Sequence, residues 1–228
     1  MIKLVILDFD DTITNNHLLD YYSFKIICTK FNTYIPTKNE IKNLRMRNYT
    51  ASEIIDYIVK RSNRIFDKKE FWKMRNRFLE SKESINHVRL RPAVKIVLKK
   101  LKSIGLKLVI GSLRKRRSII TQILEKHGLL KYIDAVFLHS NKQNTRDLQV
   151  GYKIKKHLYR KILNNYKVNR KEIISIGDSV TDIKAAKYYG INHVSLHFDG
   201  DYFPRPKIKN HIQSFRDIYK LINRLNNK

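Results

Sequence analysis

The sequence has a single cysteine, few glycines and prolines, and no long hydrophobic run. Cys28 stands alone among 228 residues, so an internal disulfide and a zinc site built from several cysteines are both excluded. No stretch of about 18 apolar residues occurs, and we therefore expect no membrane-spanning helix and no membrane partner. The N-terminus shows no charged-then-apolar leader. We expect a cytoplasmic protein in a reducing compartment, or a nuclear one if the source is eukaryotic or viral.

Acidic residues are also scarce. The chain has 20 Asp and Glu against 48 Lys and Arg, which gives a formal net charge of +28. The excess is uneven, because residues 91–228 contain 31 basic and 9 acidic residues whereas residues 1–14 contain 1 and 3. One interpretation is a polyanionic partner such as nucleic acid, bound through the basic core surface. The other is a solvated basic surface in a chain whose composition is rich in Lys, Asn, Ile and Tyr. Both remain open at this point.

Short apolar segments alternate with amphipathic segments along residues 1–14 and 91–228. Because strands that alternate with helices form parallel sheets, this order predicts an α/β fold with a Rossmann-like, doubly wound parallel sheet. Gly105, Gly128 and Gly190 mark helix ends. The predicted strands are 2–9, 106–111, 134–139, 172–177 and 193–196. The predicted helices lie between Pro92 and Gly105 and at 116–127, 154–166, 180–189 and 215–225.

Residues 15–90 show helical patterns only. Thr50 and Glu53 form a capping-box pattern before "IIDYIVK", and Asp67 with Glu70 resembles a second one before "FWKMRNRFL". Strand-like alternation does not interrupt the region. We expect a helical cap inserted after the first strand, with residues 1–14 and 91–228 forming the core.

Acidic and polar residues lie at the ends of the predicted strands. Ligands of such sheets bind beyond the carboxyl ends of the strands, so residues at these ends should converge. Asp8 and Asp10 end the first strand and share one face of it. One carboxylate can attack phosphorus, and the other can exchange a proton with the leaving oxygen and with water. Asp178 and Asp182 follow a later strand, and a divalent cation such as Mg²⁺ would offset the crowded negative charge.

Two further side chains complete the predicted chemistry. The Ser112 hydroxyl follows the strand at 106–111 and can donate a hydrogen bond to a phosphoryl oxygen. Lys153, after the third strand, can neutralise charge on a phosphoryl–aspartate intermediate. Arg114 begins the basic run "RKRR" (114–117) and is the member of it nearest to the predicted site. We consider three roles for this run: substrate contact by Arg114, exposed charge at a helix start, or nuclear targeting.

Four ordered segments resemble the motifs of the haloacid dehalogenase superfamily. They are "DFDDT" (8–12), "VIGS" (109–112), Lys153 and "GDSVTD" (177–182). Lys153 lies 24 residues before Gly177, about where members similar to phosphoglycolate phosphatase place their lysine, and "AAKYYGINHVSL" also resembles that group. The helical insert resembles the small cap of the family. The resemblance covers nearly the whole chain and implies a Rossmann-like core with a helical cap.

The resemblance also implies roles for individual residues. It makes Asp8 the nucleophile and Asp10 the general acid/base. It implies that Asp8, Asp10 through its backbone carbonyl, and Asp178 bind Mg²⁺, while Asp182 supports the metal or Lys153. Dehalogenases of the family lack the second acid, because halide leaves without a proton. The presence of Asp10 therefore favours a phosphatase.

The remaining implied roles concern the substrate side of the site. Thr12 would steady the first loop and Ser112 would bind the phosphate. Asp11 stands where the family usually has glycine, which adds charge and restricts the turn. The prolines that usually follow the lysine are absent from "KIKKH", so Lys155 and Lys156 are alternatives to Lys153.

The sequence thus favours a Mg²⁺-dependent phosphatase that hydrolyses a phosphomonoester through a phospho-aspartyl intermediate. The substrate class remains open, because motifs of this kind specify chemistry rather than substrate. A small phosphorylated substrate is the first candidate, and a terminal phosphate on nucleic acid is the second. A third alternative is a basic nucleic-acid-binding protein on an inactive phosphatase fold, against which the complete set of acids argues.

Overall fold

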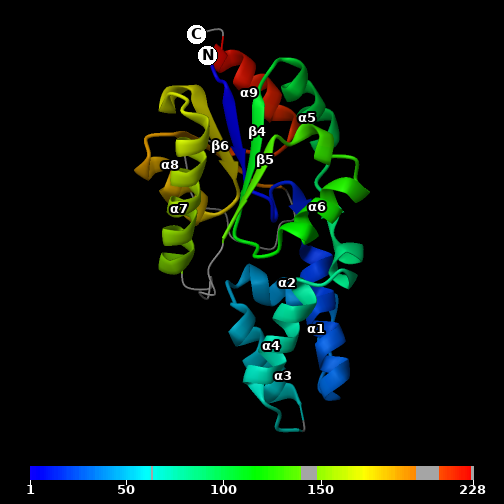
Figure 1. Cartoon of the computed structure of the whole chain (residues 1–228). Coiled ribbons are helices and arrows are strands. Elements are labelled where there is room, and N and C mark those ends of the chain that lie inside the picture. Colours follow the sequence, from blue (N-terminus) through cyan, green and yellow to red (C-terminus); the bar gives the residue numbers. More distant parts are fainter. Residues whose placement is uncertain (63, 140–147, 199–210, 227–228) are drawn as a thin grey trace. The chain divides into compact units, whose positions relative to one another are not determined.

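The computed structural model describes residues 1–62, 64–139, 148–198 and 211–226 (Figure 1). These residues divide into two compact units. One, here called the core, contains residues 1–15, 90–198 and 211–226, and the other, the helical unit, contains residues 16–89. The division places the α/β elements and the helical elements in separate bodies. That the helical unit acts as a cap stays a prediction.

Within the described residues, the core is built on a six-stranded sheet in the order β5-β4-β1-β6-β7-β8. Neighbouring strands pair in parallel throughout. The predicted α/β class with a parallel, Rossmann-like sheet is therefore confirmed. The strands are β1 (Leu4–Leu7), β4 (Lys107–Ser112), β5 (Ala135–Leu138), β6 (Ile173–Gly177), β7 (Asn192–Leu196) and β8 (His211–Ile212). Two short strands, β2 (Thr14–Asn15) and β3 (Arg89–Leu90), form a separate two-stranded sheet.

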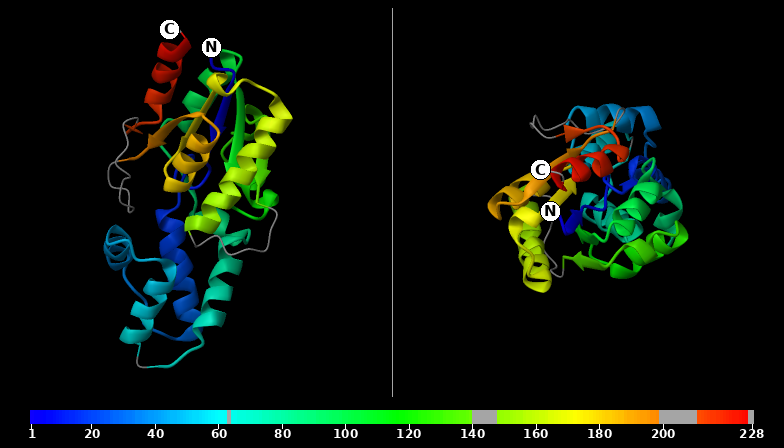
Figure 2. Two further views of the ribbon diagram at one scale, coloured as in Figure 1. Left: turned by 90° about the vertical axis from the view of Figure 1, so that its left-hand side faces the viewer. Right: turned by 90° about the horizontal axis from the view of Figure 1, so that it is seen from above.

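Helices cover both faces of the core sheet. The chain moves from β1 through β4 to β5 in one direction and from β5 through β6 to β7 in the other. Because parallel crossovers are right-handed, this reversal places α7 and α8 on one face and α5 and α6 on the other, as Figures 1 and 2 show. The helices are α5 (Val94–Ser103), α6 (Arg117–Lys126), α7 (Leu148–Tyr166), α8 (Val180–Tyr188) and α9 (Arg216–Asn226), the last of which packs on α5. Short 3₁₀ turns are η2 (Leu130–Tyr132) and η3 (Arg170–Glu172).

The sheet forms because its central strands are apolar on both faces. All four residues of β1 are fully buried, and β6 is buried along its length. Branched side chains such as those of Ile6, Ile162 and Ile173 pack into one cluster between the sheet and α7. This packing fixes the carboxyl ends of β1, β4 and β6 at one edge of the sheet.

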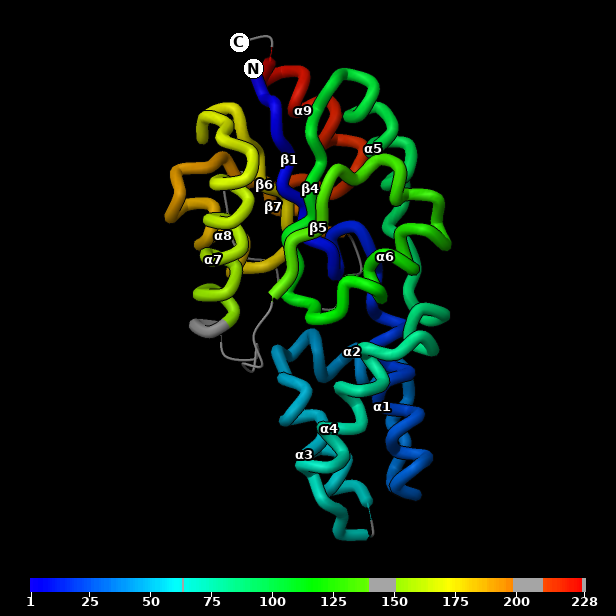
Figure 3. Tube along the Cα trace, in the orientation of Figure 1, coloured from blue at the N-terminus to red at the C-terminus, as the bar shows by residue number. Residues whose placement is uncertain are grey.

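The helical unit contains α1 (His17–Phe31), α2 (Lys38–Met46), α3 (Ala51–Arg61) and α4 (Lys68–Leu79), followed by the 3₁₀ turn η1 (Glu83–His87) (Figure 3). Thr50 and Glu53 form the predicted capping box, and Asp67 caps α4 by accepting a hydrogen bond from the Lys69 amide. None of the helices in the described ranges has the length and apolar character that crossing a membrane requires.

A buried ion cluster lies inside the helical unit. The Asp20 carboxylate of α1 accepts two hydrogen bonds of 2.8 Å from Arg45 of α2 and one of 2.6 Å from Arg75 of α4. The Arg75 guanidinium also lies 4.2 Å from the centroid of the Phe24 ring. Burial by itself would raise the pKa of Asp20, but the two guanidinium groups overcome this effect and lower it. The cluster thus ties three helices together.

Candidate active site

Asp8 is placed at the carboxyl end of the central strand. Its amide follows the buried strand β1 and donates a 2.8 Å hydrogen bond to the Ile176 carbonyl of β6. Asp8 is only 9 % exposed, and the Lys155 ammonium donates a hydrogen bond to its Oδ1 atom. Burial raises the pKa of Asp8 to about 7, Asp182 and Asp10 add to the rise, and Lys155 opposes it.

Lys155, rather than Lys153, is the lysine of this site. Lys155 is 1 % exposed, and its ammonium lies 2.7 Å from Oδ1 of Asp182 and donates a 2.8 Å hydrogen bond to the Gly111 carbonyl. Burial by itself would lower the pKa of Lys155, but Asp182 and Asp8 overcome this effect and raise it. Lys153 lies on the exposed side of α7. The predicted site lysine is therefore corrected from Lys153 to Lys155, which the sequence had offered as an alternative.

The helical phase of α7 explains this correction. A two-residue step turns a helix by about 200°, so Lys153 and Lys155 face opposite ways. Lys155 is flanked by the buried residues Ile154, Leu158 and Tyr159, and therefore belongs to the face of α7 that packs on the core. Motif spacing alone selected Lys153, whereas the apolar pattern of the helix contained the signal for Lys155.

Asp178 and Asp182 converge with Asp8. One carboxylate oxygen from each of the three lies within 4.8 Å of the others. Burial raises the pKa of Asp178 well above its usual range, and the nearby Asp8 carboxylate adds to the rise. Asp182 is 1 % exposed and also accepts a hydrogen bond from the Ser179 hydroxyl, which caps α8. Lys155 therefore pairs with two of the three carboxylates, those of Asp8 and Asp182, and Asp178 lies beside them.

Gly177 is required where β6 runs into this site. A Cβ atom at Gly177 would lie 2.6 Å from Cγ of Asp182. No side chain fits in that space without moving the carboxylate. The glycine that opens "GDSVTD" therefore lets Asp182 approach the end of β6 closely.

Asp10 is held by Arg114. The Arg114 Nε atom donates to both carboxylate oxygens of Asp10, at 2.9 and 3.0 Å, and its Nη2 atom donates to Oδ1 at 2.8 Å. Ser112 ends β4, is fully buried, and accepts a 3.2 Å hydrogen bond from the Arg114 amide through its Oγ atom. The structure thus brings the predicted Ser112 and Arg114 to the site and adds a contact of Arg114 with the predicted acid/base residue.

Two residues of the loop after β1, Asp11 and Thr12, each form a hydrogen bond with a distant segment of the core. Thr12 is fully buried and donates a 3.1 Å hydrogen bond to Oδ1 of Asp178, which joins the first and last motifs. Asp11 has φ +57°, the left-handed conformation that glycine adopts without strain and that Asp tolerates better than most residues. The Arg91 Nε atom donates a 3.1 Å hydrogen bond to the Asp11 carbonyl. Sequence reasoning did not single out Arg91, and no motif marks it.

The arrangement fits a hard divalent cation. Asp8, Asp178 and Asp182 offer only oxygen ligands, which Mg²⁺ prefers. Burial and the neighbouring carboxylates raise the pKa of both Asp8 and Asp178, and a bound cation would favour their ionised forms. Lys155 and Ser179 already bind Asp182, so Asp8 and Asp178 are the carboxylates best placed to hold such an ion.

Comparison with solved structures identifies proteins of the same fold. A predicted phosphoglycolate phosphatase from Haemophilus somnus is 22% identical, with a TM-score of 0.76, and the match covers 97% of this chain and 98% of that one. A predicted phosphatase from Clostridium acetobutylicum is 18% identical, with a TM-score of 0.71 and coverage of 98% and 99%. CbbY from Rhodobacter sphaeroides, solved in complex with phosphate, is 15% identical, with a TM-score of 0.64 and coverage of 96% and 96%.

Comparison with sequences identifies the family. No curated protein matches the chain significantly. The model of the haloacid dehalogenase-like hydrolase family matches residues 5–196, a range that includes every residue of the candidate site. The chain therefore belongs to the haloacid dehalogenase-like hydrolase family.

Proposed function

We propose that the protein is a Mg²⁺-dependent phosphatase that hydrolyses a phosphomonoester through a phospho-aspartyl intermediate on Asp8. The observation that carries the proposal is the convergence of the Asp8, Asp178 and Asp182 carboxylates at the carboxyl edge of the sheet, where a buried lysine pairs with Asp8 and Asp182. Family membership supports a hydrolase, and the phosphate complex of CbbY is consistent with a phosphate site on this fold. A buried nucleophile next to a cation and oxygen ligands suits phosphoryl transfer.

The first step is attack by Asp8. Lys155 binds Oδ1, and Oδ2 of Asp8 makes no hydrogen bond within the described part of the chain, so Oδ2 is the oxygen free to attack phosphorus. As the new O–P bond forms, the bond between phosphorus and the leaving oxygen breaks, and Asp10 gives that oxygen a proton. Ser112 donates a hydrogen bond to a phosphoryl oxygen, and Lys155 offsets the negative charge.

The second step is hydrolysis of the phospho-aspartate. Asp10, now deprotonated, takes a proton from water, and the oxygen of that water attacks phosphorus. The bond between phosphorus and Asp8 breaks, which releases inorganic phosphate and restores the carboxylate. Arg114 orients the Asp10 carboxylate through its three hydrogen bonds. When bound by Asp8 and Asp178, Mg²⁺ would supply positive charge that keeps the site ionised and offsets the charge of the phosphoryl group.

The test is phosphate release from p-nitrophenyl phosphate with and without Mg²⁺. Asp8→Asn removes the nucleophile with little change in shape, and turnover should fall by at least about 10⁴-fold while circular dichroism stays unchanged. Asp217→Asn, in the first turn of α9, is the matched control and should keep full turnover. Equal turnover in the wild type and Asp8→Asn would refute the assignment.

The substrate class requires a separate panel. Mononucleotides, phosphorylated organic acids and end-phosphorylated oligonucleotides should be compared by kcat/KM. We propose the small phosphomonoesters as the better substrates. A preference for the oligonucleotides by tenfold or more would assign the enzyme to terminal phosphates instead.

A further inference from the structure

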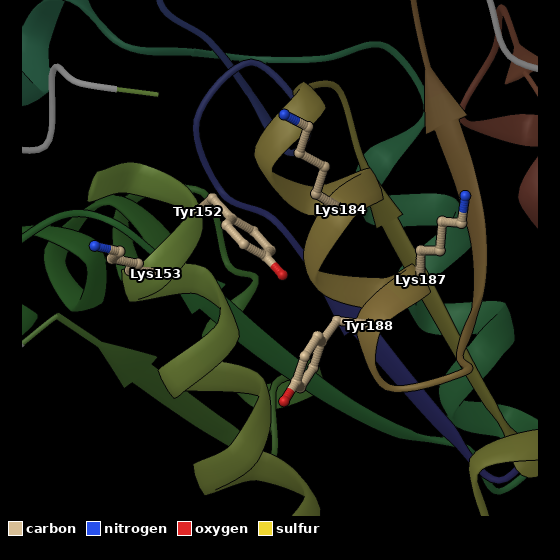
Figure 4. A pocket seen from close by; sticks show the side chains of 5 residues that line it. All are labelled: Tyr152, Lys153, Lys184, Lys187 and Tyr188. Atoms are coloured by element: carbon tan, nitrogen blue, oxygen red, sulfur yellow. The ribbon is translucent and has the colours of Figure 1, made fainter. Parts of the chain in front are cut away.

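A pocket lies on the core between α7 and α8. It has a volume of about 500 Å³ and is lined by Tyr152, Lys153, Lys184, Lys187 and Tyr188. Figure 4 shows the two tyrosines reaching into the space between the helices, with the three lysines extending outward around them. These five residues are here called the α7–α8 groove. It has the size of a ligand site, and no step of the proposed phosphatase reaction uses its residues.

The groove is strongly basic. Besides its three lysines, α7 contributes Lys156 and Arg160 on its outer side. Asp182 is the only acidic residue within the sequences of α7 and α8, and it is buried and pairs with Lys155. Because no carboxylate on the outer side of the two helices offsets these cations, the groove attracts anions.

The aromatic residues restrict what kind of anion fits. Tyr188 is 55 % exposed, and the Lys156 ammonium lies over one face of its ring, 3.5 Å from the centroid, so a stacked base would use the opposite face. Tyr152 comes from the facing helix and is half-buried. Partly exposed rings beside lysines can stack with unpaired bases while the phosphates of the strand pair with the cations. Bases paired in a duplex cannot reach such rings.

The spacing of the lysines indicates a strand rather than a single nucleotide. Lys153 and Lys156 lie three residues apart on α7, as do Lys184 and Lys187 on α8, so each pair spans roughly 4.5 Å along its helix axis. One phosphate group needs one or two of these cations, whereas consecutive phosphates can use all of them. We propose that the α7–α8 groove binds single-stranded nucleic acid, with bases stacked on Tyr152 and Tyr188 and phosphates paired with the lysines. This site is independent of the phosphatase chemistry.

The test measures binding of a fluorescent 12-mer without terminal phosphate to the full chain, by anisotropy over a range of salt concentrations. The groove variant is Lys153→Gln/Lys184→Gln/Lys187→Gln. At about 50 mM NaCl it should bind roughly 100-fold more weakly, and its slope of log affinity against log salt should be shallower by about 2. The matched control is Lys30→Gln/Lys60→Gln/Lys99→Gln, which removes the same charge from exposed positions outside the groove and should change the affinity by less than about threefold.

The tyrosines need their own variant. Tyr152→Ala/Tyr188→Ala should weaken single-strand binding by roughly tenfold or more and leave the salt slope unchanged, because it removes stacking but no charge. Thermal unfolding establishes that each variant is folded. Equal losses in the two lysine variants, or no effect of the tyrosine variant, would overturn the proposal. Equal affinity for duplex would overturn it too, as would displacement of the strand by an equal concentration of free mononucleotide.

Discussion

The two units of the protein each bury a cluster of charged side chains. Carboxylates outnumber cations in one cluster, and cations outnumber carboxylates in the other. In the core, Asp8 and Asp182 both pair with Lys155, and Asp178 adds a third carboxylate to the same group. In the helical unit, Asp20 faces both Arg45 and Arg75. The pKa of Asp8 is raised to about 7 by burial, whereas that of Asp20 is lowered because two guanidinium groups outweigh burial.

The difference separates the proposed reactive site from a structural cluster. A carboxylate that is fully paired, like Asp20, gains nothing from an added cation and serves to hold helices together. Carboxylates that outnumber their cation are unstable by themselves and attract a metal ion. An added cation would therefore stabilise the core cluster, whereas it would not stabilise the helical-unit cluster.

The largest expected effect concerns Lys155. Lys155→Met leaves Asp8 and Asp182 buried without their cation, and we expect turnover to fall by at least about 10³-fold and the free energy of unfolding to fall by about 3–5 kcal/mol. Lys153→Met, on the exposed side of the same helix, should change turnover by less than a factor of two and the free energy of unfolding by less than about 0.5 kcal/mol. Steady-state kinetics and urea unfolding measure these effects. A larger loss for Lys153→Met would restore the spacing-based assignment.

The next effect concerns Asp20. Asp20→Asn leaves two buried guanidinium groups without their carboxylate and should lower the free energy of unfolding by about 3 kcal/mol. Asp56→Asn is the control, because Asp56 pairs with Lys68 at an exposed position where such a pair contributes about 0.5 kcal/mol or less. Urea unfolding followed by circular dichroism compares them. Equal losses would show that burial does not distinguish the Asp20 cluster.

Mg²⁺ should stabilise the protein through the core cluster and not through the helical-unit cluster. The expected gain is smaller than the losses predicted for the two substitutions above. At a Mg²⁺ concentration about 100 times the Kd, the wild type should gain about 2.7 kcal/mol, or roughly 5–10 °C in Tm. Asp178→Asn should lose at least half of this gain, and Asp20→Asn should keep all of it. Differential scanning fluorimetry with Mg²⁺ and with EDTA provides the measurement. A full gain in Asp178→Asn would remove Asp178 from the metal site.

The smallest effect is the change in the free energy of unfolding per pH unit, measured without metal. The folded protein holds the Asp8 proton up to about pH 7, whereas the unfolded chain releases it near 3.8. The contribution of Asp8 therefore falls as the pH rises from about 4 to 7, by at most about 1.4 kcal/mol per pH unit. The contribution of Asp20 has the opposite sign, because it is present above about pH 4 and lost as the pH falls through the lowered pKa.

Subtracting variants isolates each contribution to this pH dependence. The stability of the wild type minus that of Asp8→Asn should decrease from pH 4.5 to pH 7. The stability of the wild type minus that of Asp20→Asn should stay constant above about pH 5 and decrease only in stronger acid. If both stability differences changed with pH in the same direction, the contrast between Asp8 and Asp20 would be contradicted.

Much of the core could be predicted from the sequence, because its signals are local. The apolar run before Asp8 and the helix-ending glycines locate β1, α5 and α8 within a few residues. The short strands β2, β3 and β8 were missed, since two residues give no periodicity. Carboxylates in the first and last motifs could likewise be named in advance, because strand ends of a parallel sheet meet at one edge.

The remaining site contacts could not be predicted because they join distant segments. The Arg114–Asp10 contact spans 104 residues and the Arg91–Asp11 contact spans 80. Nothing local to either arginine specifies its partner. The same holds for the Asp20 cluster, whose arginines lie on two different amphipathic helices, α2 and α4.

By itself the sequence determined the α/β order of elements and the carboxylates that meet at the sheet edge, because periodicity and strand ends are local properties. Tertiary structure alone decided which lysine serves them, which arginine holds Asp10, and which buried charges are balanced. The physical reason is that the energy of a buried charge depends on every group within a few ångströms of it, and folding brings those groups from anywhere in the chain.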